Sequence, residues 1–322
     1  MNQPLHHPTR VVNRGDRLFR GILGLFGLVV LAIALLILVE LWEVARPSVE
    51  RFGLRFLIET QWDPVREQFG ALPFVYGTLV SSLIAILLAV PLGLGVAFFL
   101  SEMAPRWLRE PVSFLVELLA AIPSVVYGLW GLFVLVPIIR SLELAILRTG
   151  LSRVPLFSGA PYGIGMLSAG VVLAIMIVPT VAAVSREVFR AVPDSQREAA
   201  LALGATRWEA MKVVFDYGRP GIVGAVVLAW GRALGETMAV NMVIGNQPII
   251  SASLFSPAHT MASVIASEFN EAVEPMHVAA LAEIGLALLG LTLLLSALAR
   301  LLVLRVERRS RGRQAAQGVT SP

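Results

Sequence analysis

The chain has 322 residues, 57% hydrophobic and 15% charged, with a formal net charge of +4 and a mean hydropathy of +0.77. This composition is too apolar for a soluble domain of that length, so we expect an all-α membrane protein. The absence of cysteine excludes a disulfide framework and a thiolate metal site. The basic residues flank apolar stretches and form no patch with stacking aromatics, which argues against a nucleic-acid partner.

Six stretches are long and apolar enough to cross a bilayer, because a helix needs roughly 20 residues to span the hydrocarbon. The first follows several arginines, but its uncharged run from Gly21 to Val39 is too long for a signal peptide, so we expect a retained helix. The six predicted spans are 18–42, 75–100, 112–139, 164–184, 221–245 and 278–304.

These spans predict four parts. They are a cytoplasmic tail over 1–17, a leading helix over 18–45, a five-helix core over 71–304, and a cytoplasmic tail over 305–322. The loops that alternate between the spans carry eighteen Lys and Arg on one side and seven on the other, leaving only Arg232 inside a span. Because basic residues resist translocation, both termini are expected to face the cytoplasm.

The longest cytoplasmic loop, 185–219, contains the string "VPDSQREAALALGATRWEAMK". Ser195 with Glu198, and Thr206 with Glu209, each have the spacing of a capping box. Gly204 stands between them, suited to the left-handed residue that ends a helix. The loop therefore predicts two short helices joined by a tight turn.

The first of these helices carries Ala199 and Ala200, a face without bulk that would let a groove of another protein approach its backbone. An ordinary solvated hairpin fits the same pattern. A helix-turn-helix that reads DNA is disfavoured, because both ends of the hairpin are tethered to the bilayer.

Two formal charges lie inside the fifth span, in "GRALGETMAV". On a continuous helix, Arg232 and Glu236 would face the same side at i and i+4 and could pair, with Thr237 and Asn241 near the same stripe. An unpaired Arg at the bilayer centre costs about 2.5 to 3.5 kcal/mol, so a bare position against lipid is disfavoured. The pair could lock two helices together, or Arg232 could line the route of an anion, since its guanidinium offers planar donors to oxyanion oxygens.

The other spans hold fewer polar groups. Glu117 in the third span precedes Pro123, whose missing donor frees a carbonyl, so packing between helices and a place on the pathway both fit. Ser124 could donate a hydrogen bond to an oxyanion. His259 and His277 are too isolated for a metal site and are expected at the surface of the last external loop.

Four strings resemble a known family. "EAALALG" (198–204) matches the Glu-Ala-Ala-x-x-x-Gly signature of ABC importer permeases, and "ALPFVYGTL", "AAIPSVVYGLWG" and "GRALGETMAV" resemble the PstC-type permeases of phosphate-specific importers in chain order. The resemblance covers roughly residues 71–304. The Leu-Pro that closes the general signature is replaced here by Asp216 and Tyr217, so Pro220 is the nearest residue that could break the segment.

The resemblance implies the type I importer permease fold, in a subunit of the bacterial inner membrane that imports inorganic phosphate. It also implies as partners a second homologous permease, a pair of ATPase subunits and an extracytoplasmic phosphate-binding protein. The chain has no Gly-x-x-x-x-Gly-Lys-Ser/Thr loop, so ATP and Mg²⁺ are expected on the partner ATPase and no cofactor on this chain. Residues 195–209 would dock on the ATPase, and Arg232 would lie on the anion route.

Rival interpretations remain. A permease for another oxyanion, such as sulfate or molybdate, would share these motifs. A proton-coupled secondary transporter would use the intramembrane carboxylates as proton relays but leaves the Glu-Ala-Ala hairpin unexplained. An intramembrane hydrolase lacks Ser, His and acid together at membrane depth.

Overall fold

The structure, a computed structural model, describes the backbone of residues 14–318 and the side chains of residue 15 and residues 18–301. The expected tail residues 1–13 and the last four residues lie outside this part. The helices are α1 (Arg14–Phe52), α2 (Leu72–Phe98), α3 (Arg106–Ala121), α4 (Ser124–Trp130), α5 (Val136–Leu147), α6 (Met166–Arg190), α7 (Asp194–Ala202), α8 (Arg207–Leu234), α9 (Met238–Val243), α10 (Met261–Glu268) and α11 (Pro275–Gly318).

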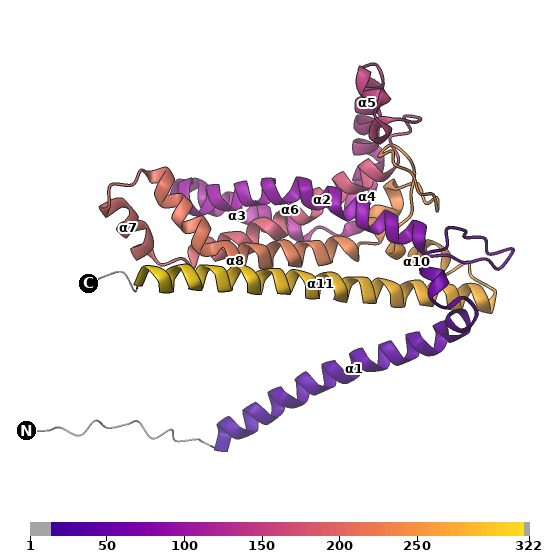
Figure 1. The fold of residues 1–322 in the computed structure, drawn as a ribbon, viewed down its shortest axis with the longest axis horizontal. Helices are drawn as coiled ribbons and strands as arrows, with labels where there is room; N and C mark the ends of the chain where they lie inside the picture. The colour runs from indigo at the N-terminus through magenta and orange to yellow at the C-terminus, as the bar shows by residue number, and fades with distance from the viewer. Residues whose placement is uncertain (1–13, 319–322) are drawn as a thin grey trace, which may run out of the picture.

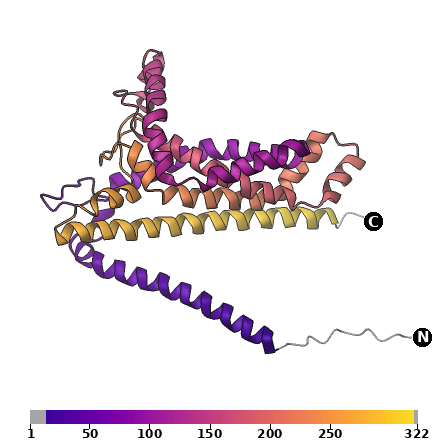
Figure 2. The same cartoon turned by 180° about the vertical axis from the view of Figure 1, so that it is seen from behind.

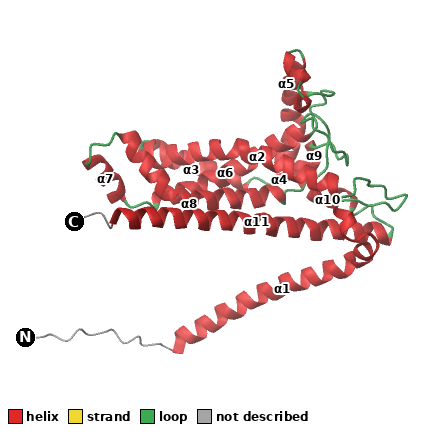
Figure 3. Cartoon of the chain, viewed as in Figure 1, coloured by secondary structure: helices red, strands yellow, loops and turns green. Residues whose placement is uncertain are grey.

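The described residues form helices and loops with no named strand, and six helical segments are long and apolar enough to cross a membrane (Figure 3). This confirms the expected all-α membrane architecture with six spans. The loops gather mainly at the end of the bundle opposite α7 (Figure 3).

The helices α2, α3, α6, α8 and α11 run side by side, whereas α1 diverges from them and meets the N-terminal part of α11 near its own C-terminal end (Figures 1 and 2). The side chains of Ala45 and Ser48 are buried at this junction. The leading helix is therefore joined to the core at one end only.

Small residues bring α2 and α6 close together. Ala85 and Ala89 of α2 are fully buried, and a methyl group placed on Gly93 would lie 2.7 Å from Cβ of Val181 on α6. In membranes, association depends on van der Waals contact and small side chains allow it. The pair α2 and α6 thus forms the centre of the core.

The third predicted span, 112–139, is wrong as a single helix. α3 ends at Ala121, and Ile122 adopts an extended conformation with φ −66° and ψ 129°. The cause is Pro123, because the ring of a proline disfavours helical backbone at the preceding residue. After α4 and a π-helical turn over Gly131–Leu135, α5 projects away from the bundle (Figure 1).

The fifth predicted span, 221–245, is also wrong in its extent. α8 starts earlier, at Arg207, runs through Pro220 without a break and ends at Leu234, with Gly235 as its C-cap. Glycine is a weak helix former, and Glu236 turns back to accept a bond from the backbone N–H of Ala239 at 3.5 Å, at the start of α9. The turn 235–237 separates two residues that were expected on one helix.

The two histidines of the last external loop are buried, with 2% of His259 and 8% of His277 exposed, so the prediction of surface positions is wrong. His277 contacts Glu268 through Nε2 at 3.0 Å, and Trp62 donates to the same carboxylate at 2.9 Å. Trp62 and Phe69 pack against the ring of His277, whereas Phe74 of α2 packs against the ring of His259. Burial lowers the pKa of His259 to about 4, so it is neutral at physiological pH.

Candidate translocation and coupling sites

Arg232 is an exposed cation at the C-terminal end of an apolar helix. Its Nη1 donates to Oγ1 of Thr180 on α6 at 3.4 Å, and it lies close enough to the Tyr127 hydroxyl of α4 for its charge to act there. Tyr127 itself is buried and donates to the carbonyl of Leu119 at 2.8 Å. Arg232 therefore sits where α4, α6 and α8 meet. Because a charged group within the bilayer is costly against lipid, we expect its exposed face to meet water or another subunit.

The expected pairing of Arg232 with Glu236 is not formed. Within the described residues no ion pair joins them, because α8 ends between the two and the i, i+4 geometry is lost. Glu236 is half-buried and faces the backbone of α9. The interpretation of this pair as a locking clasp is wrong for this conformation, and Glu236 does not restrain Arg232 here.

Thr237, Asn241 and Ser124 occupy the surroundings of this turn. Thr237 is the N-cap residue of α9, and its carbonyl accepts from the backbone N–H of Asn241 at 2.9 Å. The side-chain oxygen of Asn241 is buried and has no partner among the described residues. Ser124 begins α4, half-buried, directly after the break at Pro123. All three stay predicted pathway residues.

Glu117 of α3 forms an ion pair with Arg186 of α6. Its Oε1 lies 3.0 Å from Nη2 of Arg186 on α6, whose side chain is only 10% exposed. Arg186 also contacts Glu187 at 3.2 Å. Arg186, which the sequence predicted to lie in the loop 185–219, is thus a second cation buried against α3.

The hairpin predicted for the cytoplasmic side consists of α7 and the start of α8. Thr206 accepts from the backbone N–H of Glu209 at 3.3 Å, and the Glu209 carboxylate accepts from the backbone N–H of Thr206 at 2.8 Å. The second predicted capping box is therefore confirmed. The first is wrong: α7 has Pro193 as N-cap without a side-chain cap, and Ser195 and Glu198 lie inside the helix, where their spacing caps nothing.

Gly204 ends α7 with φ +85°, as its position predicts. Its N–H donates to the carbonyl of Leu201 at 3.0 Å, and the N–H of Ala205 donates to the carbonyl of Ala200 at 3.1 Å. This is the Schellman arrangement, which needs a residue tolerant of positive φ. Gly204 fixes the turn between α7 and α8.

The hairpin presents apolar side chains to its surroundings. Leu203 is 90% exposed and Trp208 70% exposed, while Ala199 is exposed and Ala200 half-buried. Exposed apolar residues that gather in one patch are typical of interaction surfaces. The expected docking surface of 195–209 stays a prediction, and these side chains support it.

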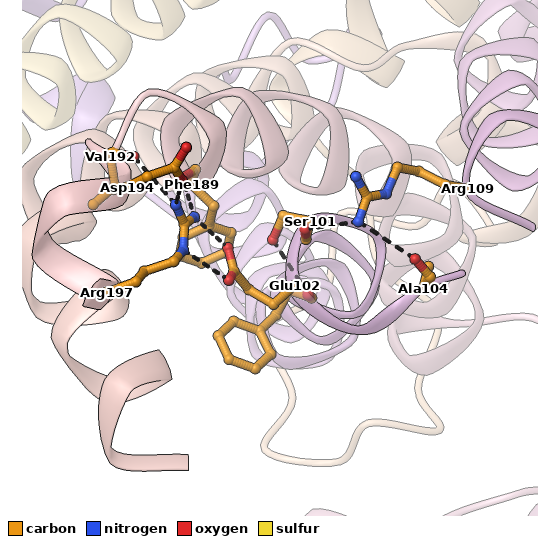
Figure 4. A network of polar contacts seen from close by, with 9 residues as sticks. Ser101, Glu102, Ala104, Arg109, Phe189, Val192, Asp194 and Arg197 are labelled. Carbon is orange, nitrogen blue, oxygen red and sulfur yellow. Dashed lines mark hydrogen bonds and ion pairs between the residues drawn. The ribbon is translucent and has the colours of Figure 1, made fainter. Parts of the chain in front are cut away.

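Arg197 of α7 ties the hairpin to the membrane helices (Figure 4). Its Nη2 and Nε bind the two carboxylate oxygens of Glu102 at 2.7 and 3.0 Å, and it also donates to the carbonyl of Phe189 at the end of α6 and to Asp194. The hydrogen bond with Glu102 raises the pKa of Arg197 above its ordinary value. Glu102 belongs to the π-helical turn Phe99–Met103 that follows α2.

The same turn is held from the other side by Arg109 of α3, which donates to the carbonyls of Ser101 and Ala104 at 3.2 and 3.3 Å (Figure 4). Sequence reasoning missed Arg186, Arg197 and Glu102, because each pairs with a residue at least 69 positions away. The side chain of Glu102 is only 8% exposed, and nothing in the neighbouring sequence indicates this burial.

Comparison with known proteins places the chain. Residues 89–311 match the model of the binding-protein-dependent transport system inner membrane component. The chain belongs to this family. It is accordingly a multi-pass inner membrane protein, a transport permease subunit that assembles with other subunits into an ABC transporter.

Curated relatives are similar over about three-quarters or more of their own length. The phosphate transport system permease protein PstC of Haemophilus influenzae is 46% identical over 91% of this chain and 94% of its own length. The protein of the same name from Mesorhizobium japonicum is 47% identical over 87% of this chain and 89% of its own. A probable PstC of Methanocaldococcus jannaschii is 40% identical over 71% and 74%.

Two solved transporters share the fold. The MetNI methionine ABC transporter, in an inward-facing conformation, matches with a TM-score of 0.55 at 20% identity, covering 72% of this chain and 94% of that one. A bacterial ABC transporter involved in the import of alginate matches with a TM-score of 0.53 at 18% identity, covering 90% and 99%. The type I importer permease fold is confirmed.

Proposed function

We propose that the chain is a permease subunit of an ATP-driven importer of inorganic phosphate and forms half of its translocation pathway. The observation that carries this proposal is the 46% identity to a phosphate transport permease over more than nine-tenths of both chains. The geometry fits, because an exposed Arg232 at the junction of α4, α6 and α8 offers fixed positive charge to an oxyanion. No observation favours sulfate or molybdate as cargo.

The partners follow from the same assignment. A second homologous permease would cover the exposed side of Arg232 and complete the pathway. A pair of ATPase subunits, holding the ATP and Mg²⁺, would bind the hairpin of α7 and α8 from the cytoplasm, and both termini would lie on that side. An extracytoplasmic phosphate-binding protein would deliver cargo to the loops at the opposite end.

The mechanism passes force through the hairpin. When the ATPase pair closes, α7 moves with it, and the bonds of Arg197 to Glu102 and to the end of α6 carry that movement to α2 and α6. The helices around Arg232 then open alternately to the two sides. Phosphate gives up hydrogen bonds to water and accepts hydrogen bonds from the Arg232 guanidinium. It is released when water enters the surroundings of Arg232 again.

The test is phosphate uptake by the complete transporter in proteoliposomes containing ATP. Arg232→Gln should reduce uptake by at least about tenfold, because loss of a charge-assisted hydrogen bond costs about 1.5 to 3 kcal/mol. Arg219→Gln removes an exposed arginine from the same helix and serves as the control with normal uptake. Normal uptake by the Arg232 variant, or uptake of labelled sulfate in preference to phosphate by the wild type, would contradict the proposal.

A further inference from the structure

A second charged site lies between α3 and α6. A cavity of about 280 Å³ opens there, lined by Glu110, Ser113, Phe114, Glu117, Arg186 and Arg190. It lies toward the ends of α3 and α6 that adjoin the cytoplasmic hairpin (Figure 1). The volume is ample for one tetrahedral oxyanion with a few waters.

The cavity is built around a buried cation. The Arg186 side chain is only 10% exposed, and Glu117, 57% exposed, is the carboxylate that reaches it from α3. Ser113 is 8% exposed, and its hydroxyl has no hydrogen-bond partner in the part of the chain that the structure describes. A buried polar group without a partner is costly, so a ligand that bonds Ser113 would be favoured.

This cavity is close to the site of Arg232 along the same helix. Thr180, which contacts Arg232, and Arg186 are six residues apart on α6, which corresponds to a rise of about 9 Å. Six residues also turn the helix by about 240°, so Thr180 and Arg186 lie on different faces of α6, and Arg186 is the next cation toward the C-terminal end of this helix.

We propose that this cavity is a second anion station, selective for hydrogen phosphate, and this inference rests on the proposed function. Arg186 and Ser113 donate to phosphate oxygens, while Glu117 leaves its ion pair and accepts the P–OH proton in a hydrogen bond. A carboxylate only accepts hydrogen bonds, so it repels a fully ionised oxyanion such as sulfate. A phosphodiester headgroup also lacks the P–OH group and fits the carboxylates poorly.

The chain has no cysteine, so a single introduced thiol reports on this cavity alone. In the complete transporter, reconstituted with cysteine-free partner subunits, Phe114→Cys is labelled with a small cationic thiosulfonate. Trp107→Cys, also on α3 and 76% exposed but outside the cavity lining, is the matched control. Inorganic phosphate should slow labelling several-fold at position 114 and leave position 107 unchanged, whereas sulfate at equal ionic strength should do neither.

Two further variants test the assigned roles in the Phe114→Cys background. Arg186→Gln should raise the phosphate concentration that gives half protection by about tenfold or more, because a charge-assisted interaction is lost. Glu117→Gln, whose amide can also donate, should let sulfate protect as well as phosphate. If the arginine variant fails to assemble, the glutamate variant decides alone, and an unchanged preference for phosphate would refute the station.

The remaining outcomes are separable. The inference is overturned if phosphate and sulfate protect the Phe114→Cys thiol from labelling equally well. It is also overturned if the labelling rate depends on the content of anionic lipid and not on phosphate. Absence of protection in a complex that still imports phosphate would refute the station and leave the proposed function intact. A wild-type complex that imports no phosphate would instead refute the proposed function.

Discussion

The bond between Arg197 and Glu102 should transmit force, and Glu102→Gln tests this with little change of shape. The substitution removes the charge from a two-pronged contact at 2.7 and 3.0 Å. The side chains are 23% and 8% exposed, which places the pair between a surface ion pair, at 0 to 1 kcal/mol, and a buried one, whose breaking costs 3 to 5 kcal/mol. We therefore expect a loss of about 2 kcal/mol, or about 30-fold in the equilibrium that releases α7 from the end of α2.

Two measurements follow on the complete transporter. Amide hydrogen exchange in α7 should accelerate by up to about 30-fold, because only the bond of Arg197 to Phe189 and the packing against α8 then remain among the contacts described here for α7. Stimulated ATP hydrolysis should persist while phosphate uptake falls, since the ATPase still binds the hairpin but its movement no longer reaches α2. A double-mutant cycle with Arg197→Gln should give a coupling energy of about 2 kcal/mol.

Asp194→Asn is the matched control, because Asp194 binds the same arginine but is 86% exposed. It should change exchange and coupling little. The reasoning is refuted if Glu102→Gln leaves the exchange of α7 and the ratio of uptake to ATP hydrolysis at wild-type values. Loss of uptake and hydrolysis together, with dissociation of the ATPase, would show that the bond serves assembly and not transmission.

Three further expectations concern the turns and the external loop. Gly77→Ala should lower the thermal unfolding temperature, because its methyl group would lie 2.1 Å from the carbonyl oxygen of His259. Gly95→Ala is the control: its methyl group would meet nothing within 4 Å, so the change should be neutral or stabilising. Equal effects of the two substitutions on the unfolding temperature would contradict this expectation. Gly204→Val forces a β-branched residue to φ +85°, costing about 1 to 2 kcal/mol, and should reduce co-purification of the ATPase, while Gly204→Asn should retain it. Because the pKa of His259 is about 4 in the folded chain and 6.5 in the unfolded one, the unfolded chain binds more protons between these values. Folding stability should then fall by at most about 3 kcal/mol as the pH drops from 6.5 to 4 and stay flat above 6.5, a dependence that His259→Gln should remove.

Local patterns in the sequence predicted much of the fold. The count of six spans follows from apolar runs whose length the bilayer dictates. The hairpin of α7 and α8 was predicted from Thr206, Glu209 and Gly204, since caps and left-handed turns involve residues a few positions apart. The break at Pro123 was half visible: its missing donor was evident, but the change of direction into α5 was not.

The pairings of charges were decided by tertiary structure. Arg232 has Thr180 and Tyr127 as neighbours in place of Glu236, because α8 ends at Leu234, two residues before Glu236. Sequence spacing gives the partner of a charge only while the helix continues. The sequence alone determined that a cation lies within a span and that a hairpin with a capping box at Thr206 follows the fourth span. Only the packing of α2, α3 and α6 decided that Glu102 meets Arg197 and Glu117 meets Arg186, because these contacts join segments whose separation along the chain carries no periodic signal.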